Sequence, residues 1–354
     1  MARYIFNPEH DLCLAAGEAD YIPPASAVEF ARQCQWIERY MADGASAGDG
    51  IVPWGWNSVL RKRLQQEGCE VNLLPDYNFL DFIRHNSRRE GAVELLGELE
   101  RGVAVVEEEK KGKVCGVVPS DYRIVARSIR EVEEFLGEKG KVVLKAPLSG
   151  SGKGIRFVAG KLMETDRGWC RRILERQGAV VVEQRLDVVQ EFAMLFGYEV
   201  KAAGSGSDAG GVEVRFRGYS LFYASNGAYK GNLLASNGHI EGLLGKWVAP
   251  EVLEKVRCRV ERFLQERLQE AAGRGCRMLP GYVGVDQFIC RRGIGEALLY
   301  NPAVEINFRM TMGHIARNIF DLHSAEFGLG EGTHCFEPLQ GVIPVYADAG
   351  LYHK

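Results

Sequence analysis

The first 86 residues alternate short apolar runs with segments in which apolar side chains recur at helical spacing. Residues 3–8 (RYIFNP) predict a buried strand followed by a long polar loop, and residues 25–41 predict a helix. The apolar run at 51–52 and the segment 70–74 (EVNLL) predict two further strands. Short strands that alternate with helices are typical of a small parallel sheet of Rossmann-like type.

The remaining chain keeps this mixed pattern with longer elements. We expect helices over residues 88–100, 129–136, 165–177, 249–272 and 312–325. We expect strands over residues 141–146, 179–184, 190–200, 283–290 and 297–306. Three segments have the composition of loops: 107–111, 203–211 (AGSGSDAGG) and 291–295. The whole pattern predicts an α/β chain built of α+β lobes.

The composition is that of an ordinary globular protein. Of its 354 residues, 46% are apolar and 26% are charged, enough for two or three lobes with a large core. A net charge of -3 and a pI of about 6.2 give no electrostatic footprint for nucleic acid or anionic membrane. Glu9 and Asp11 fall where a signal peptide needs its apolar core. No apolar run approaches the ~20 residues that span a bilayer, so we expect a cytoplasmic protein.

Cysteine usage points the same way. The nine cysteines form no CxxC pair, and their number is odd. A disulfide framework or a structural zinc site is therefore not expected, and reduced, mostly buried thiols are the better interpretation.

Residues 141–158 (KVVLKAPLSGSGKGIRFV) combine a strand that carries a cation with a loop of small residues. Small residues let backbone N–H groups approach an anion closely, and a nearby cation adds charge. The residues that this pattern offers to a phosphate are Lys145, Ser149, Gly150, Ser151, Gly152 and Lys153. The spacing fits neither a Walker A loop, because a glycine follows Lys153, nor a GxGxxG motif. A glycine-rich hairpin turn is the alternative interpretation.

A second pattern is the apolar strand 180–187 (VVVEQRLD), which contains a Glu-x-x-Leu sequence. Glu183 to Leu186 place hydrogen-bonding groups beside an apolar surface, and Glu191 follows shortly after. An adenine ring needs this combination, with hydrogen bonds at its edge and apolar walls on its faces. The alternative is that Glu183 is a solvated residue at a strand edge.

The third pattern joins Asp286 on one strand to Glu305-x-Asn307-x-Arg309 on the next. Period two places Glu305, Asn307 and Arg309 on one face of their strand, and strand pairing would bring Asp286 beside them. Two carboxylates and an amide oxygen suit Mg²⁺ bound together with nucleotide phosphates. The alternative is a buried salt bridge of either carboxylate with Arg309. We favour the metal, because buried acidic groups are costly without a cation.

In this order the three patterns resemble the ATP-grasp superfamily, which includes D-alanine–D-alanine ligase, biotin carboxylase and glutathione synthase. That family carries a lysine strand with a glycine-rich loop, then an adenine-hinge strand, then an acidic residue and a Glu-x-Asn metal motif. The resemblance covers about residues 87–320. It implies a Rossmann-like lobe before the ATP-grasp fold over 1–86, a small lobe over 87–187 and a large lobe over 188–354.

The resemblance also implies nucleotide contacts. Lys145 would bind the phosphates of ATP, and the loop 149–154 would close over them. Glu183 to Leu186 would hold the adenine, and Glu191 or Asp187 would bind the ribose. Ser87-Arg88 stand where the family often has Asp-Lys, a further nucleotide contact.

On the metal side, Asp286, Glu305 and Asn307 match magnesium ligands, and Arg309 matches an arginine that contacts the reacting groups. The interval from Asp286 to Glu305 is longer than the family's, and residues 201–240 match nothing in it. The implied activity is a ligase that uses ATP and Mg²⁺ to activate a small-molecule carboxylate as an acyl phosphate and joins it to an amine or similar nucleophile. The alternatives are an ATP-grasp kinase for a small molecule and a nucleotide-binding module without turnover.

Candidates for substrate contacts lie outside these motifs. The loop after the first strand carries Glu9 and His10, flanked by Asn7 and Asp11. His10 would act as a base or hold a substrate carboxylate. A loop capped by its own Asn and Asp side chains is the alternative.

Three further groups have two interpretations each. His314 either faces the site or caps the helix that begins beside it. Residues 226–232 (NGAYKGN), which include Tyr229, Lys230 and Asn232, either contact a ligand or form a turn. Trp54 and Trp56 are expected in the core rather than on a stacking surface.

Overall fold

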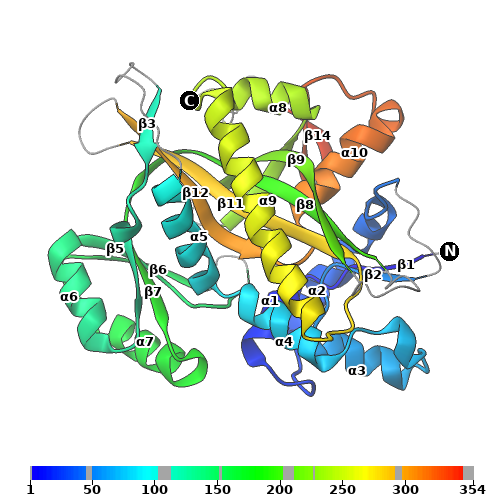
Figure 1. Cartoon of the computed structure of the whole chain (residues 1–354), viewed down its shortest axis with the longest axis horizontal. Coiled ribbons are helices and arrows are strands. Elements are labelled where there is room, and N and C mark those ends of the chain that lie inside the picture. Colours follow the sequence, from blue (N-terminus) through cyan, green and yellow to red (C-terminus); the bar gives the residue numbers. More distant parts are fainter. Residues whose placement is uncertain are drawn as a thin grey trace.

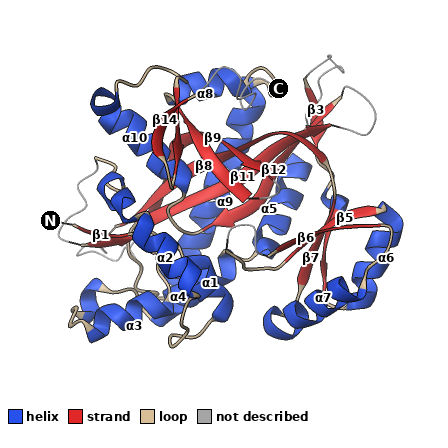
Figure 2. Cartoon of the chain, turned by 180° about the vertical axis from the view of Figure 1, so that it is seen from behind, coloured by secondary structure: helices blue, strands red, loops and turns tan. Residues whose placement is uncertain are grey.

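The computed structural model describes most of the chain. The described residues are 2–44, 50–102, 113–150, 154–201, 211–225, 228–291 and 297–345. Three sheets and the helices around them make up this part and confirm the predicted α/β fold (Figure 1, Figure 2). Most of the predicted loops 107–111, 203–211 and 291–295 lies outside the described residues. Within the described ranges no helix combines the length and the apolar character that crossing a membrane requires, and all nine cysteines are free thiols, five of them buried.

The N-terminal part contains a parallel pair of short strands, β1 (Arg3–Ile5) and β2 (Ile51–Pro53). The predicted parallel sheet is therefore present, with two strands. The helices around it are α1 (His10–Ala16), α2 (Ala25–Gln33), η1 (Gln35–Tyr40), α3 (Ser58–Gln66), η2 (Val71–Leu73) and α4 (Tyr77–Asn86), of which η1 and η2 are 3₁₀ helices.

Three local predictions in this part are wrong. Residues 70–74 contain the 3₁₀ helix η2 instead of a strand. Val71 and Leu73 are 47% and 38% exposed and are not buried as the side chains of a core strand would be. The helix predicted over 25–41 is interrupted at Cys34, whose thiol donates to the Pro338 carbonyl at 3.3 Å. The loop predicted after the first strand contains helix α1.

A four-stranded antiparallel sheet follows in the middle of the chain, with helices packed on one face. Its strands, in spatial order, are β4 (Arg123–Ala126), β7 (Val180–Gln184), β5 (Lys141–Lys145) and β6 (Ile155–Ala159). Its helices are α6 (Ile129–Lys139) and α7 (Glu164–Gln177). Ser128 caps α6 by accepting from the Glu131 N–H at 3.3 Å. These elements confirm the predicted strand and helix positions.

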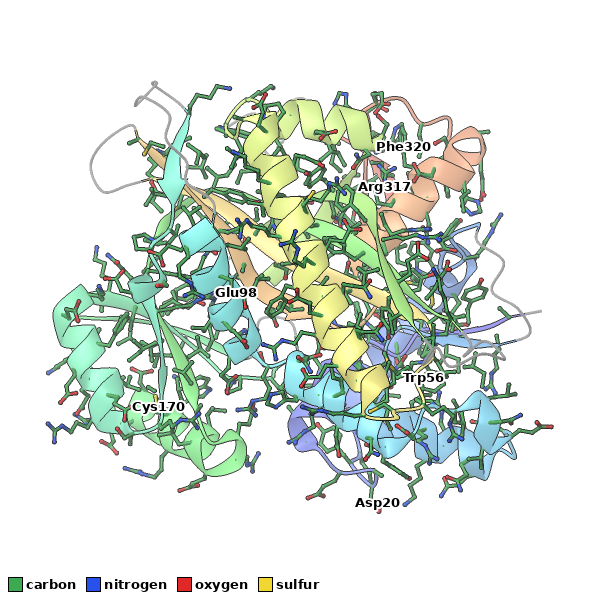
Figure 3. The ribbon with its side chains drawn as sticks, viewed as in Figure 1. Asp20, Trp56, Glu98, Cys170, Arg317 and Phe320 are labelled. Atoms are coloured by element: carbon green, nitrogen blue, oxygen red, sulfur yellow. The ribbon has the colours of Figure 1, made fainter. Side chains whose placement is uncertain are left out.

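Period-two alternation divides the two faces of this small sheet. One face packs on α6 and α7, where Cys170 is fully buried (Figure 3). The apolar residues on that face are Val142, Leu144, Val180 and Val182. The alternate positions Lys145 and Glu183 point to the opposite face, and the register pairs Glu183 with Arg123. The strand pattern alone therefore gathers three charged side chains on the face opposite α6 and α7.

The largest sheet has eight strands, in the order β14-β13-β10-β9-β8-β11-β12-β3. Their bounds are β3 (Val114–Val117), β8 (Asp187–Val200), β9 (Val212–Ser225), β10 (Ala228–Leu234), β11 (Gly281–Arg291), β12 (Leu298–Asn307), β13 (His334–Glu337) and β14 (Gly341–Pro344). The associated helices are α5 (Arg89–Gly102), η3 (Ser120–Tyr122), α8 (Asn237–Leu244), α9 (Pro250–Gly273) and α10 (Met312–Phe327). Helix α9 crosses one face and α10 lies on the other (Figure 1).

Alternation also decides where the acidic residues of this sheet point. Val283, Val285 and Ile306 belong to the core that α9 covers. Asp286 and Glu305, at alternate positions, therefore point to the face away from α9. The two residues are paired across β11 and β12, as the predicted hairpin requires.

Candidate functional site

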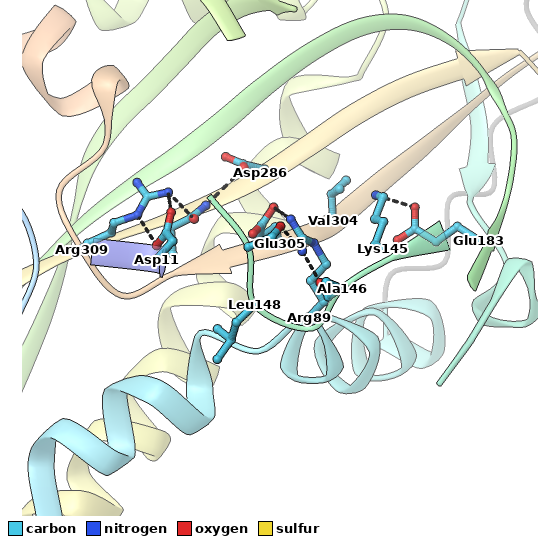
Figure 4. A network of polar contacts seen from close by, with 12 residues as sticks. Asp11, Arg89, Lys145, Ala146, Leu148, Glu183, Asp286, Val304, Glu305 and Arg309 are labelled. Atoms are coloured by element: carbon cyan, nitrogen blue, oxygen red, sulfur yellow. Dashed lines mark hydrogen bonds and ion pairs between the residues drawn. The ribbon is translucent and has the colours of Figure 1, made fainter. Parts of the chain in front are cut away.

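A buried ion pair lies on the face of the small sheet opposite α6 and α7. The Lys145 ammonium is 2.6 Å from one oxygen of the Glu183 carboxylate (Figure 4), and the Arg123 guanidinium is 3.6 Å from the other oxygen. Burial alone would raise the pKa of Glu183, but Lys145 and Arg123 hold it below its ordinary value. Glu183 is 4% exposed, so the alternative of a solvated strand-edge glutamate is excluded. Lys145 is 12% exposed and uses one of its three donors on Glu183.

The carboxylates of Asp286 and Glu305 lie opposite each other on β11 and β12. Burial, together with the negative charge of Glu305, raises the pKa of Asp286 to about 7. The Asn307 amide donates to Asp286 at 3.2 Å. Two neighbouring carboxyl groups that repel each other in a buried position form a site that a divalent cation would stabilise.

Arg309 does not form the salt bridge with this acidic pair that was the alternative interpretation. Its guanidinium forms a two-pronged pair with Asp11 at 2.9 and 2.8 Å. It also donates to the Asn307 side-chain oxygen at 2.9 Å and lies over the ring of Trp54. Arg309 thus connects the end of β12, which carries Glu305 and Asn307, to the first turn of α1. The N-terminal part of the chain therefore borders the site.

The donor set fits a hard cation that shares its coordination with phosphate. Among the described residues, no group of three or more His, Cys, Asp or Glu side chains is placed to hold a metal. Asp286 and Glu305 supply two carboxylates, while the Asn307 amide nitrogen faces Asp286 and its oxygen faces Arg309. Mg²⁺ typically takes one or two protein carboxylates and completes its shell with water and substrate phosphates. The set therefore suits a metal that enters together with a phosphate ligand.

Asp286 provides a prediction about stability and pH. Its pKa is about 7 in the folded protein against an ordinary 3.8, so between these values the folded state binds more protons than the unfolded state. Its contribution to stability therefore falls as pH rises from about 4 to 7 and stays low above that range. We expect Asp286→Asn to raise the free energy of unfolding by about 1–3 kcal/mol at pH 8.

The measurement is urea unfolding in EDTA at pH 5 and pH 8. The gain from the substitution should be smaller at pH 5, where the folded wild type already carries the proton. Equal stability of wild type and variant at pH 8 would show that the two carboxylates do not strain each other.

Arg89 is a site residue that the sequence patterns missed. Its guanidinium, 5% exposed, donates to the Glu305 carboxylate at 3.1 Å, to the Ser149 hydroxyl at 3.1 Å and to the Ala146 carbonyl (Figure 4). The sequence does carry a signal, because Arg89 falls in phase with the buried stripe of α5. The buried residues of that helix are Arg89, Ala92, Leu95, Leu96 and Leu99.

The neighbouring pair Ser87-Arg88 takes no part in the site. Ser87 ends α4, and Arg88 pairs with Glu90 at 2.6 Å and donates to the Gln177 carbonyl at 2.7 Å. Arg89, and not Arg88, is the cation that contacts the stem of the glycine-rich loop.

The described ends of the glycine-rich loop are tightly held. The Gln177 side chain makes two hydrogen bonds, at 2.8 and 3.0 Å, with the main chain of Leu148. A Cβ on Gly154 would lie 2.2 Å from the Ser149 side chain, so only glycine fits there. Gly150 lies against Leu12 of α1. The predicted phosphate contacts Ser151, Gly152 and Lys153 lie outside the described residues.

The residues predicted to contact adenine and ribose differ in their surroundings. Glu191 is partly buried on β8, which raises its pKa, while Lys145 acts in the opposite direction. Leu186 is half-buried against the main core. Asp187 is exposed and pairs with Arg291 at 2.7 Å, which leaves Glu191 as the carboxylate near Lys145.

His10 is fully buried, and its hydrogen bonds determine its tautomer. The Asn57 side-chain oxygen accepts from the Leu60 N–H at 2.9 Å, so the Asn57 amide nitrogen faces His10 Nδ1 at 3.2 Å and donates to it. The proton of the ring is then on Nε2, which has no partner among the described residues. Burial lowers the pKa of His10 to about 4. His10 is therefore neutral near pH 7, and its role toward a substrate stays a prediction.

The loop that carries His10 is locked to the segment after β2. Asn7 donates to the Gly55 carbonyl at 2.9 Å and accepts from the Gly55 N–H at 3.3 Å. Glu9 is the residue before α1, and burial raises its pKa. One Glu9 carboxylate oxygen is buried without a partner in the described part of the chain. Both predicted substrate residues thus keep an unused polar atom.

Gly55 gives a prediction on packing. A Cβ at this position would lie 2.5 Å from His10 Nδ1. We expect Gly55→Ala to lower the free energy of unfolding by about 1–3 kcal/mol, because the buried imidazole cannot move aside without leaving Asn57. Urea unfolding measures this, with Gly137→Ala in α6, where a Cβ meets nothing within 4 Å, as the control. A Gly55→Ala protein as stable as wild type would contradict the packing described.

The remaining candidate residues have packing or hydrogen-bonding roles within the fold. His314 caps α10 through Thr311, its Nε2 faces the Phe196 carbonyl at 3.2 Å, and it is 3% exposed, so its predicted substrate role is wrong. Asn232 is buried and bonds to Ser220 across β9 and β10. Trp54 and Trp56 are each 4% exposed, which confirms them as core residues (Trp56 is labelled in Figure 3).

No protein-family model and no curated protein matches the sequence. Solved structures match it in shape. N5-carboxyaminoimidazole synthetase from Staphylococcus aureus, complexed with ADP, matches 96% of this chain and 75% of its own, at 13% identity and a TM-score of 0.39. D-alanyl-alanine synthetase A from Vibrio cholerae matches 90% of this chain and 92% of its own, at 13% identity and a TM-score of 0.42. Biotin carboxylase from Campylobacter jejuni, in a β-γ-ATP complex, matches 90% of this chain and 61% of its own, at 14% identity and a TM-score of 0.42. Similarity at this level assigns no function, which has to come from the site itself.

Proposed function

We propose that the chain is an ATP-grasp ligase, which uses ATP and Mg²⁺ to activate a carboxylate as an acyl phosphate and joins it to an amine or similar nucleophile. One observation carries this proposal. The stem of the glycine-rich loop, the paired carboxylates of β11 and β12, and Arg309 belong to one connected set of contacts, in which Arg89 bridges loop and carboxylates (Figure 4). In this proposal, residues 1–86, 87–187 and 188–354 are the N-terminal, small and large lobes.

The nucleotide would lie between the face of the small sheet that carries Lys145 and the face of the large sheet that carries Asp286 and Glu305. Lys145 has two donors left for phosphate oxygens after its contact with Glu183. The loop residues Ser149, Gly150, Ser151, Gly152 and Lys153 would surround the phosphates with N–H groups. Glu183 to Leu186 would border the adenine, and Glu191, buried near Lys145, would accept from the ribose hydroxyls.

Asp286, Glu305 and Asn307 would hold Mg²⁺, which supplies charge neutralisation between the β- and γ-phosphates. A carboxylate oxygen of the substrate attacks the γ-phosphorus, the bond to the ADP oxygen breaks, and an acyl phosphate forms. The lone pair of the nucleophile then attacks the acyl carbon, phosphate leaves with its C–O bond electrons, and the nucleophile loses a proton. Arg309, fixed by Asp11, would stabilise the negative oxygens of both steps.

The acceptor would bind where the N-terminal part meets Arg309. Glu9 and His10 each keep a buried polar atom without a partner in the described part of the chain, and Asp11 joins the same turn to Arg309. Buried polar groups normally have partners, so unpaired atoms beside a reactive site favour a ligand there. The neutral His10 would donate from Nε2 to an oxygen of the substrate.

The test is product release from ATP and Mg²⁺ with pools of small carboxylates and amines. A ligase releases ADP and free phosphate when both substrate classes are present, and Glu305→Gln should abolish the release. A kinase would release ADP with a single acceptor and keep the phosphate on it, which would contradict the ligase proposal. ATP binding without any turnover across broad pools would favour a nucleotide-binding module instead.

A further inference from the structure

Arg89 occupies an unusual place between the two halves of the proposed site. It is the first residue of α5, and its own N–H donates to the Pro147 carbonyl at 3.1 Å. One guanidinium nitrogen donates to the Ala146 carbonyl and to the Ser149 hydroxyl, and the other donates to Glu305 at 3.1 Å. A single side chain thus holds together the stem of the glycine-rich loop and Glu305, one of the two proposed metal-binding carboxylates (Figure 4).

The charge of Arg89 matters as much as its hydrogen bonds. The side chain is 5% exposed, and Glu305 is the carboxylate that it contacts. Asp286 lies opposite Glu305 and is destabilised by it. Arg89 therefore compensates one of two repelling carboxylates, and in the protein without ligand it takes the position of a counter-ion.

A divalent cation that approaches Glu305 meets the positive charge of Arg89. Two cations a few ångströms apart in a poorly hydrated site repel each other strongly. Arg309, on the other side of Asn307, has Asp11 as its own partner and does not replace Arg89 at Glu305. Glu305 is already paired with Arg89, so a bare metal that binds there must displace this partner or bind beside its charge.

A nucleotide changes this balance, because its phosphates bring several negative charges to the loop that Arg89 already contacts. The guanidinium can then exchange the Glu305 oxygen for a phosphate oxygen without leaving the loop stem. Planar guanidinium groups bind carboxylate and phosphate with the same geometry. Release of Glu305 by Arg89 leaves a carboxylate oxygen free at the moment when a phosphate is present.

We propose that Arg89 excludes bare divalent cations from Asp286 and Glu305 and releases Glu305 only when a nucleoside triphosphate binds. Metal and nucleotide then bind as one unit. This inference rests on the proposed nucleotide and metal site. It assigns Arg89 as a positioning residue that sets the order of binding, beyond the general roles proposed for the loop and the metal ligands.

The test uses Mn²⁺ as the probe, with binding followed by electron paramagnetic resonance at pH 8, with and without ATP. The full chain is compared with Arg89→Ala, with Arg89→Lys, and with the control Arg101→Ala, an exposed residue on the same helix. Circular dichroism first establishes that each variant is folded. Lysine keeps the charge but cannot bridge the loop and Glu305 at once.

Arg89→Ala should bind Mn²⁺ alone at least about tenfold more tightly than wild type, because the competing charge is gone. The same variant should bind Mn²⁺ with ATP at least about tenfold more weakly, because a phosphate contact is lost. Arg89→Lys should still bind Mn²⁺ alone as weakly as wild type, and Arg101→Ala should behave as wild type throughout.

Unchanged or weaker binding of Mn²⁺ alone by Arg89→Ala would overturn the inference, since Arg89 would then orient Glu305 as a ligand. Tight binding of Mn²⁺ alone by Arg89→Lys would overturn it too, because charge would not be what excludes the metal. Failure of the proposed function has a different signature: the wild type would bind no ATP with or without Mn²⁺.

Discussion

Replacing Glu183 with glutamine is expected to lower the free energy of unfolding by about 3–5 kcal/mol. Glutamine keeps the size of the side chain but removes the charge that compensates Lys145 and Arg123. Both cations would then be buried without this partner on the face of the small sheet opposite α6 and α7, where Lys145 is 12% exposed and the Arg123 side chain is fully buried. Unpaired buried charges are among the most destabilising changes a protein can undergo.

Urea unfolding monitored by circular dichroism measures this loss. The control is Glu134→Gln on α6, whose partner Arg130 is exposed, and it should leave stability nearly unchanged. The double variant Lys145→Met/Glu183→Gln should recover part of the loss, because one of the two unpaired cations is removed. A loss below about 1 kcal/mol for Glu183→Gln would mean that the ion pair does not support this sheet.

Lys145→Met is expected to weaken ATP binding by roughly 30- to 100-fold, the effect of losing one charge-assisted hydrogen bond to phosphate. Its effect on stability should be smaller than that of Glu183→Gln, because Glu183 keeps Arg123 as a partner. Calorimetric titration of ATP and urea unfolding of the same sample separate the two effects. A strong loss of stability with unchanged ATP affinity would make Lys145 a structural residue and remove it from the site.

Much of the fold follows from local patterns. Long alternating runs predicted β11 and β12 and placed Glu305 and Asn307 on one face, and the paired register then brought Asp286 opposite Glu305. The strand predicted at 70–74 is wrong, because a five-residue segment with three apolar residues fits a 3₁₀ turn as well as a strand and nothing local decides between them.

The contacts that complete the site depend on residues far apart in the sequence. Arg89 and Glu305 are 216 positions apart, and Asp11 and Arg309 are 298 positions apart. Each pair joins two charged residues that are common on protein surfaces, so only the tertiary arrangement shows that they meet. The charge of His10 also depends on tertiary packing, because burial lowers its pKa and the residue that faces its Nδ1 is Asn57, the cap of α3.

The most direct test of the central claim is calorimetric titration of ATP into the protein with and without Mg²⁺, for wild type and for Glu305→Ala. The proposed site predicts binding by wild type that strengthens markedly with Mg²⁺, and loss of that magnesium dependence in Glu305→Ala. Wild type that binds no ATP under either condition would contradict the account, and the loop at 149–154 would then be only a turn between β5 and β6.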